Sequence, residues 1–200
     1  MPVAESARLV LIRHGESLAN AEQRFTRDAE EPLTALGTRQ ARETGGFLRA
    51  HFAPARLYSS PFRRAFDTAT EIGRHFDLEP VVVDDLREQD FGIYRGRPYG
   101  DLYGQHPAGS VERWDHLPEG GERLREVAKR AGSVLDQLAE EHVGEQVLVI
   151  SHGGVMSALR AWVRNDFSSP PVPTRNAWGY VLHGMHAAYE GPFELDELSG

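Results

Sequence analysis

Two apolar runs that each end in a histidine followed by glycine constrain the fold of this chain more than any other feature. The first run covers residues 7–12 and leads to His14, and the second covers 146–150 and leads to His152. Short continuous apolar runs bounded by glycine are typical of strands buried on both faces of a mainly parallel sheet. Ligands of open α/β sheets bind beyond the carboxyl ends of such strands. We therefore expect both histidines to lie at one rim of the sheet, in a functional site.

The rest of the chain alternates predicted strands and helices. Strands are expected at 7–13, 56–59, 80–83, 146–151 and 178–183, and helices at 34–52, 61–76, 122–142 and 154–163. This order predicts an α/β three-layer sandwich, in which a mainly parallel central sheet has helices on both faces. A chain of 200 residues without repeats or linkers predicts a single domain, 1–200. The stretch 92–121, rich in glycine, proline and aromatic residues, is expected to pass over the site.

Local patterns add two structural expectations. Ser60 is expected to cap the helix that begins at Pro61, because serine is favoured at the N-cap and proline at the first helical position. Helical spacing then predicts that the buried face of this helix consists of Phe62, Ala65, Phe66, Ala69, Ile72 and Phe76. The acidic, turn-rich residues from Glu190 onward are expected to form a loosely held end.

Composition excludes several classes of protein. The chain has no cysteine, which excludes a disulfide scaffold, a thiolate metal site and a cysteine nucleophile. Its net charge of −8 argues against a nucleic-acid binder, because the phosphate backbone requires a basic face. No apolar stretch reaches the length of a membrane span, and the amino terminus lacks a secretory pattern. These features predict a soluble cytoplasmic protein that does not contact membranes.

The positions of three arginines point to an anion site. Arg63 and Arg64 lie in the first turn of the helix after strand 56–59, where the helix dipole disfavours cations. A bound anion would offset the unfavourable interaction of these two cations with the helix dipole. The alternative is an exposed arginine that tolerates a cost well under about 1 kcal/mol. Arg13 stands beside His14 and is able to fork onto an oxyanion.

A phosphoryl-transfer site without a metal needs a nucleophile, cations around the phosphoryl oxygens and an acid for the leaving group. Glu88 and Asp90 follow the predicted strand 80–83, and spacing alone leaves each as either the acid or a solvated loop charge. The nine histidines contain no His-Glu-x-x-His pattern, and no P-loop or Rossmann fingerprint occurs. We expect neither a metal nor a cofactor.

These segments, taken in order, carry a family resemblance. They are Arg-His-Gly-Glu-Ser at 13–17 with Asn20, Ser-Ser-Pro-Phe-Arg-Arg-Ala at 59–65, Leu-Arg-Glu at 86–88, Phe-Gly at 91–92 and Ser-His-Gly at 151–153. Together they resemble the histidine phosphatase superfamily, in its phosphoglycerate mutase-like branch. The likeness runs from about residue 8 to residue 163.

The resemblance implies a role for each matching residue. His14 would be the nucleophile that forms a phosphohistidine. Glu88 would protonate the leaving oxygen and then accept a proton from the attacking water. Histidine attacks only through an unprotonated nitrogen, so the other side of the ring must be oriented. We expect a backbone carbonyl near Gly15 to do this.

The resemblance also implies a binding pocket for the phosphoryl group. Arg13, Arg64 and His152 would form its cationic part, and Asn20 would be a hydrogen-bond partner on the phosphate side. The motif places the pocket arginine directly before Ala65, which selects Arg64 over Arg63.

Two departures from the family pattern give specificity candidates. Arg27 stands where relatives often have glycine, and Tyr94-Arg95 stands where many phosphatases have tryptophan and glutamate. The predicted substrate-binding residues are Asn20, Thr26, Arg27, Tyr94 and Gly153, with Arg95 and Arg97 as further specificity candidates. The alternative for the arginines is a surface position, since all but one of the 22 lysine and arginine residues are arginine.

The expected activity is metal-independent hydrolysis of a small phosphorylated metabolite. A mutase of the phosphoglycerate type is the alternative, but it must shield its intermediate from water, and the segment 96–121 is short for that task. A non-catalytic phospho-ligand binding module should have lost His14, Glu88 or His152, and none is missing. The sequence leaves the metabolite open, and the oligomeric state as well, a homodimer included.

Overall fold

The computed structural model describes residues 7–183 and 190–193, and a six-stranded sheet lies at its centre. The strands are β1 Arg8–Arg13, β2 Arg56–Ser59, β3 Val81–Val82, β4 Gln146–Ser151, β5 Gly179–His183 and β6 Glu190–Phe193. Their order is β3-β2-β4-β1-β5-β6. The first four strands of this order are parallel, whereas β5 and β6 are antiparallel to their neighbours. The predicted mainly parallel sheet is confirmed.

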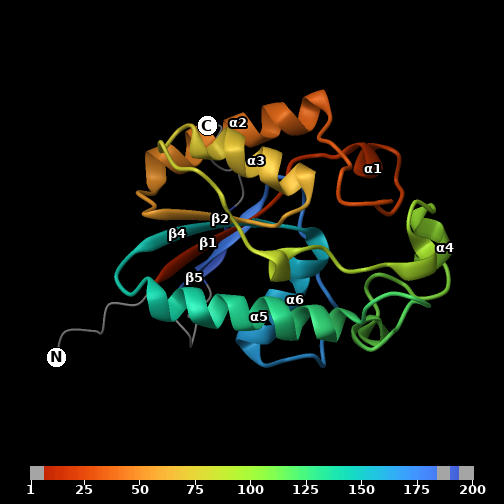
Figure 1. Cartoon of the computed structure of the whole chain (residues 1–200). Coiled ribbons are helices and arrows are strands. Elements are labelled where there is room, and N and C mark those ends of the chain that lie inside the picture. Colours follow the sequence, from red (N-terminus) through yellow and green to blue (C-terminus); the bar gives the residue numbers. More distant parts are fainter. Residues whose placement is uncertain (1–6, 184–189, 194–200) are drawn as a thin grey trace.

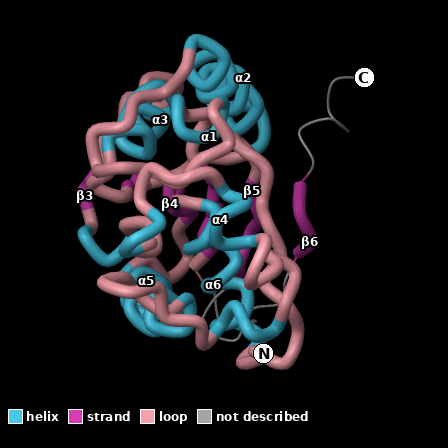
Figure 2. Tube along the Cα trace, turned by 90° about the vertical axis from the view of Figure 1, so that its right-hand side faces the viewer, coloured by secondary structure: helices cyan, strands magenta, loops and turns pink. Residues whose placement is uncertain are grey.

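Four long helices cover the two faces of the sheet. They are α2 Ala35–His51 and α3 Arg63–Gly73 on one face, and α5 Leu124–Glu141 and α6 Gly153–Arg164 on the other (Figures 1 and 2). Side chains of β1 alternate between two cores, as the period of a strand requires. Val10 and Ile12 pack with the residues of α2 and α3, and Leu9 and Leu11 pack with those of α5 and α6. This arrangement is the three-layer sandwich that the sequence predicts.

Short elements gather on the side of the molecule at which β1 ends (Figures 1 and 2). They are α1 Leu18–Ala21, which the sequence did not predict, α4 Tyr99–Tyr103 and the helical turns Gly92–Tyr94 and Val111–Trp114. A small aromatic core holds α4 and the turn Gly92–Tyr94 to the loop after α1. Phe25, Phe91, Tyr94 and Leu102 are its buried members. These elements form the wall of the site described below.

The start of α3 corrects the prediction for Ser60. The helix begins at Arg63 with Phe62 as its cap residue, and the hydroxyl of Ser60 lies 2.6 Å from Nε2 of His152. The buried face of the helix also differs from the prediction. Phe66 is 38% exposed, and Arg64 and Thr68 are buried in addition to Ala65, Ala69 and Ile72.

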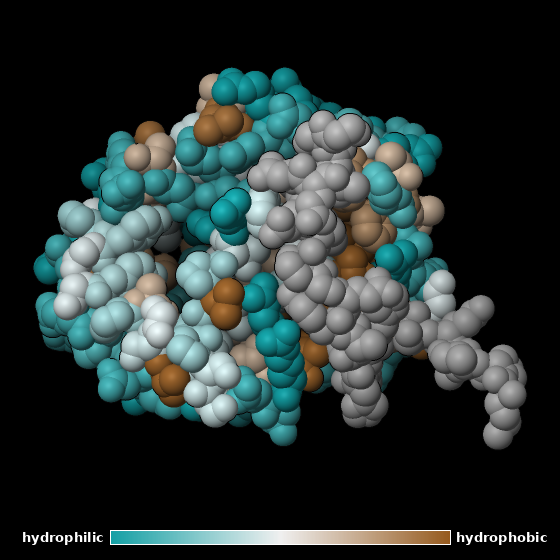
Figure 3. Space-filling model, turned by 180° about the vertical axis from the view of Figure 1, so that it is seen from behind, coloured by the Kyte–Doolittle hydropathy of each residue, from teal (hydrophilic) through white to brown (hydrophobic). Residues whose placement is uncertain are grey.

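The prediction for the end of the chain is corrected in part. Residues 190–193 form β6, which pairs with β5, rather than the start of a loose tail. The rest of that predicted tail lies outside the described residues. None of the described helices is long and apolar enough to cross a membrane. Apart from the grey atoms, the surface in Figure 3 is mostly hydrophilic, with hydrophobic residues single or in small groups.

Two glycines let the first turn of α2 touch the loop after β1. A Cβ on Gly37 would lie 2.0 Å from the carbonyl oxygen of Glu16, and a Cβ on Gly15 would lie 2.3 Å from the carbonyl oxygen of Gly37. No side chain fits between these backbones. The contact fixes the loop that carries His14 against α2.

Gly37→Ala is therefore expected to lower the free energy of unfolding by about 1–3 kcal/mol, because the new methyl group must displace backbone. Gly46→Ala in the same helix is the matched control, since its Cβ would approach nothing closer than 3.9 Å. Because alanine loses less conformational entropy than glycine on folding, the free energy of unfolding of that variant should rise by about 0.5–1 kcal/mol. Urea unfolding measures both, and equal effects of the two substitutions would contradict the close approach.

Candidate active site

A cavity of about 260 Å³ opens where β1 ends. Residues from β1, α1, α3, α6 and the segment 92–121 line it. Seven of the predicted site residues are in its wall: Arg13, His14, Asn20, Thr26, Arg64, Glu88 and Gly153. His152 lies behind the wall, fully buried, with its ring centroid 5.1 Å from that of His14. The two histidines, almost 140 residues apart in sequence, are thus neighbours.

Hydrogen bonds fix the orientation of the His14 ring. Its Nδ1 lies 2.6 Å from the carbonyl oxygen of Gly15, which is the backbone carbonyl that the sequence led us to expect. A carbonyl only accepts hydrogen bonds, so Nδ1 carries the proton and Nε2 has the free lone pair. Nε of Arg64 donates to that lone pair at 3.1 Å. Nε2 of His14 is therefore the ring nitrogen that carries the lone pair.

Both histidines are neutral in the ligand-free protein. Burial lowers the pKa of His14 well below its usual value, and the cations Arg64 and Arg13 lower it further. The pKa of His152 is lowered well below its usual value by burial first, and then by Arg64, His14 and Arg13. Protonation costs more free energy for a buried imidazole next to two guanidinium groups than for an imidazole in water. The lone pair of His14 is thus available at neutral pH.

Two buried arginines give the cavity positive charge. Arg13 donates from Nη1 to the carbonyl oxygen of Thr174 at 2.5 Å, and its buried Nε has no hydrogen-bond partner in the described part of the chain. Burial lowers the pKa of Arg64 to about 10; Glu88 opposes this shift and Arg13 adds to it. Buried cations are costly unless an anion neutralises them. The site is therefore built to receive an anion.

The neighbouring arginine does not belong to this site. Arg63 is exposed on α3 and forms an i,i+4 ion pair with Asp67 at 3.5 Å. Its backbone N–H donates to the carbonyl oxygen of Ala29 at 2.8 Å, so this amide is not free for a ligand. The motif-based choice of Arg64 over Arg63 agrees with this placement.

His152 is held by the serine that the sequence assigned to a helix cap. Nε2 lies 2.6 Å from Oγ of Ser60, which also accepts a hydrogen bond from the backbone N–H of Phe62 at 3.2 Å. The hydroxyl of Ser60 has both a proton and a lone pair left for Nε2, and where it donates its proton the ring proton of His152 is on Nδ1. That nitrogen is buried and has no protein partner among the described residues. His152 then keeps one unused donor beside His14.

The geometry distinguishes the two carboxylates that spacing alone left open. Oε1 of Glu88 accepts a hydrogen bond from the backbone N–H of Gln89 at 2.9 Å, and Oε2 accepts one from Gly154 at 3.4 Å, in the first turn of α6. Asp90 instead forms an ion pair with Arg95 and is not part of the cavity wall. Glu88 is thus the carboxylate that faces the site.

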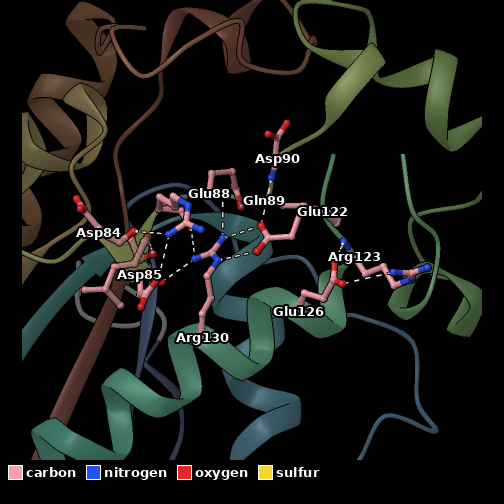
Figure 4. A network of polar contacts seen from close by, with 12 residues as sticks. Asp84, Asp85, Glu88, Gln89, Asp90, Glu122, Arg123, Glu126 and Arg130 are labelled. Atoms are coloured by element: carbon pink, nitrogen blue, oxygen red, sulfur yellow. Dashed lines mark hydrogen bonds and ion pairs between the residues drawn. The ribbon is translucent and has the colours of Figure 1, made fainter. Parts of the chain in front are cut away.

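An arginine–glutamate pair, Arg130 with Glu122, holds the backbone that carries Glu88 (Figure 4). Arg130 reaches from α5 and donates to the carbonyl oxygens of Asp85 at 2.6 Å, Arg87 at 2.9 Å and Glu88 at 3.2 Å. The carboxylate of Glu122 binds the same guanidinium group through both oxygens, at 2.8 and 2.9 Å. No sequence pattern distinguishes Arg130 from an ordinary arginine on the surface of a helix.

Asn176 is a further residue that the sequence did not indicate. Its Nδ2 donates to the carbonyl oxygens of His14 at 3.0 Å and Gly15 at 3.2 Å, and to Oδ1 of Asn20 at 3.0 Å. Asn20 in turn donates from Nδ2 to the hydroxyl of Tyr99 at 3.1 Å. These bonds join the loop after β1 to the loop before β5. No local motif marks Asn176, because its partners are distant in sequence.

Four of the specificity candidates do not reach the cavity wall: Arg27, Tyr94, Arg95 and Arg97. Tyr94 packs into the aromatic core beside Phe25, and Arg95 is exposed and paired with Asp90. Their positions beside family motifs suggested these residues, but in the folded chain they lie outside the cavity wall. Tyr99, Tyr103 and Arg113 from the same segment line the cavity in their place.

Acid is expected to destabilise the ligand-free protein through His14 and His152. The unfolded chain binds protons at these histidines near pH 6.5, whereas the folded protein does so only at much lower pH. The free energy of unfolding should thus fall below about pH 6.5, by up to about 1.4 kcal/mol per pH unit for each histidine. Urea unfolding at pH 7.5 and 5.5 measures this. His14→Gln and His152→Gln should each show a smaller drop than the native protein, and an equal drop in all three would contradict the assignment.

The chain belongs to the histidine phosphatase superfamily (branch 1), whose sequence pattern it matches over residues 9–172. It is 34% identical to a metal-independent phosphoserine phosphatase of Arabidopsis thaliana, over 90% of this chain and 77% of the relative. It is 30% identical to phosphoserine phosphatase 1 of Hydrogenobacter thermophilus, over 76% of this chain and 74% of that protein. The solved mycobacterial glucosyl-3-phosphoglycerate phosphatase in complex with VO3 superposes with a TM-score of 0.81, at 26% identity, over 92% and 97% of the two chains.

Within this family, the chain is a phosphatase that acts on small phosphorylated metabolites. The cavity fits that class in size, because about 260 Å³ lies near the lower end of the range for small-molecule pockets. The described residues contain no group of three or more His, Asp or Glu side chains placed to hold a metal ion.

Proposed function

We propose that this protein hydrolyses phosphomonoesters through a covalent phosphohistidine on Nε2 of His14. The observation that carries the proposal is the neutral, oriented imidazole of His14 beside Arg13 and Arg64, neither of which forms an ion pair within the described residues. Phosphoryl transfer depends chiefly on positioning and on stabilising charge. Both requirements are met here by side chains of the protein.

In the first step, the lone pair of Nε2 attacks phosphorus, and the bond between phosphorus and the ester oxygen breaks. Glu88 enters this step protonated and gives its proton to the leaving oxygen, which departs as an alcohol. The Nε–H of Arg64 changes its hydrogen-bond acceptor from Nε2 of His14 to a phosphoryl oxygen, which frees the lone pair for the attack. The unused Nε–H of Arg13 and Nδ1–H of His152 bind further phosphoryl oxygens.

In the second step, water attacks phosphorus and the bond between phosphorus and Nε2 breaks. The carboxylate of Glu88 takes the proton from the water, so the step returns both Glu88 and neutral His14 and releases inorganic phosphate. The backbone N–H groups of Gln89 and Gly154 hold the carboxylate in place for both transfers. Arg130 and Glu122 are positioning residues for the segment that carries it.

The remaining predicted residues of the wall would bind the substrate. Asn20 keeps one N–H beyond its bond to Tyr99, and this donor suits a phosphate oxygen. Thr26 accepts a hydrogen bond from Nη1 of Arg64 at 3.2 Å and so orients that guanidinium group. Gly153 leaves room for Arg13, since a Cβ there would lie 3.3 Å from Cζ of Arg13. We further propose that residues 1–200 act as one domain, with 92–121 covering the site.

Phosphate release from a panel of phosphomonoesters in excess chelator tests this proposal. Release is expected to continue unchanged with the chelator, because no step uses a metal. Loss of release that returns with added divalent ions would overturn the metal-independent mechanism. 3-Phosphoglycerate belongs in the panel and should be checked for isomerisation as well as hydrolysis. Isomerisation without phosphate release would make the protein a mutase.

A further inference from the structure

Arg113 is a buried cation in the wall of the cavity that no step above uses. It belongs to the helical turn Val111–Trp114 in the segment 92–121, and it is only 3% exposed. The cavity that it lines is the one lined by His14, Arg13 and Glu88. A ligand in this cavity therefore reaches both the nucleophile and Arg113.

The partners of Arg113 do not neutralise its charge. Nη2 donates to Oε1 of Gln89 at the long distance of 3.4 Å, and the guanidinium carbon lies 5.5 Å from the ring centroid of Tyr103. Nη1 is buried and has no hydrogen-bond partner among the described residues. Both neighbours are neutral groups. Burial lowers the pKa of Arg113, and the only ionisable groups that oppose this shift are Tyr103 and Tyr94.

Arg24 shows what a structurally satisfied arginine looks like in the same wall. It is 7% exposed, and its guanidinium group contacts the carboxylates of Glu31 and Glu22, each at 2.5 Å. These ion pairs raise its pKa. Arg113 is buried as deeply but has no such pair in the described part of the chain. A buried unpaired charge is expensive, so a binding partner of opposite charge is missing from this position.

We propose that Arg113 binds a carboxylate group of the substrate, so that the substrate is a small phosphomonoester that carries a carboxylate besides its phosphate. This inference rests on the proposed function, because it places the phosphate at His14. Arg113 is then the residue that determines specificity. A planar guanidinium group matches a carboxylate in shape, and the free Nη1 supplies the donor.

The charges of the wall favour a carboxylate over a second phosphate. Arg113 supplies one uncompensated positive charge, whereas a phosphate monoester carries nearly two negative charges at neutral pH. Arg24 adds nothing, because Glu22 and Glu31 already neutralise it. Both subsites lie in the wall of the same cavity of about 260 Å³, with Tyr103 beside them. A short molecule therefore spans them.

Two pairs of phosphomonoesters that differ in one carboxylate test the proposal. Phosphoserine is compared with phosphoethanolamine, and 3-phosphoglycerate with glycerol 3-phosphate, by kcat/KM for the native protein and Arg113→Met. The native protein should prefer the carboxylate member of each pair. The kcat/KM of Arg113→Met should be lower than that of the native protein by roughly 10- to 100-fold for that member, because this is the contribution of a hydrogen bond to a charged group. For the other member it should fall by less than about threefold. This ratio is independent of how much of the variant folds.

Arg125→Met is the matched control, because Arg125 is an exposed arginine paired with Asp115 on the outside of the segment. It should leave both preferences unchanged. Equal preferences in native protein and Arg113→Met, with hydrolysis intact, would overturn the role of Arg113 and leave the proposed function standing. If no compound is hydrolysed, the affinities of the four compounds are compared by calorimetry. A carboxylate preference that Arg113→Met removes would then support the subsite alone, and its absence would overturn it.

Discussion

His14→Ala is expected to lower the turnover of phosphomonoesters by about 10⁴-fold or more, because the nucleophile cannot be replaced by another group in the cavity. Nε2 of His14 is a neutral nitrogen with an oriented lone pair in the wall of the cavity, whereas His152 lies behind that wall. Without it, the pocket still binds a phosphate group through Arg13 and Arg64, but the group has no acceptor other than water. Steady-state phosphate release measures the loss.

The covalent intermediate gives this prediction a second readout. Native protein mixed briefly with a ³²P-labelled substrate and quenched in alkali should retain the label, because a phosphohistidine is stable in alkali and labile in acid. His14→Ala should retain none. His51→Ala is the matched control, since His51 is exposed at the end of α2, and it should keep both the label and the turnover. Labelling that persists in His14→Ala would place the intermediate on another residue.

The sequence predicts the fold well because its signals are local and strong. Continuous apolar runs identify β1 and β4, and helical spacing identifies α2 and α5 to within about two residues. Errors arise where tertiary packing decides the outcome. Ser60 has the chemistry of an N-cap, but its hydroxyl lies against His152 instead, and the helix starts later. β6 pairs with β5, the strand before it, although the acidic, turn-rich residues from Glu190 onward predicted a loose end.

The same distinction between local signals and tertiary packing applies to the residues of the candidate site. Residues carried by motifs, such as His14, Arg64 and Glu88, come together as the sequence indicates. The segment 92–121 has no such motif, and its side chains are sorted by packing. Tyr94 therefore enters the aromatic core, whereas Arg113 points to the cavity. In a chain whose cations are nearly all arginine, Arg113 is distinguished by its place in the cavity wall together with a buried Nη1 that has no hydrogen-bond partner among the described residues.

Glu88→Gln is expected to lower turnover by roughly 10²- to 10⁴-fold for substrates with a poor leaving group, which is the usual contribution of a general acid. Glutamine keeps the shape of the side chain, and its amide oxygen accepts one of the two hydrogen bonds from Gln89 and Gly154, but it has no proton to give. Alkyl phosphates should suffer most, because an alkoxide does not leave unprotonated. p-Nitrophenyl phosphate should lose less than about tenfold in its first step, since its phenolate departs without a proton.

Asp90→Asn provides the comparison that separates acid catalysis from damage to the loop. Asp90 is two residues from Glu88 and carries the same charge, but it is paired with Arg95 outside the cavity. Asparagine retains an oxygen for the hydrogen bond from the backbone N–H of Gly92. This variant should keep turnover within about threefold for every leaving group, because its side chain never meets the substrate. A loss from Glu88→Gln that is equal for alkyl and p-nitrophenyl phosphates, as measured by the rate of phosphoenzyme formation, would show that Glu88 does not act as the acid.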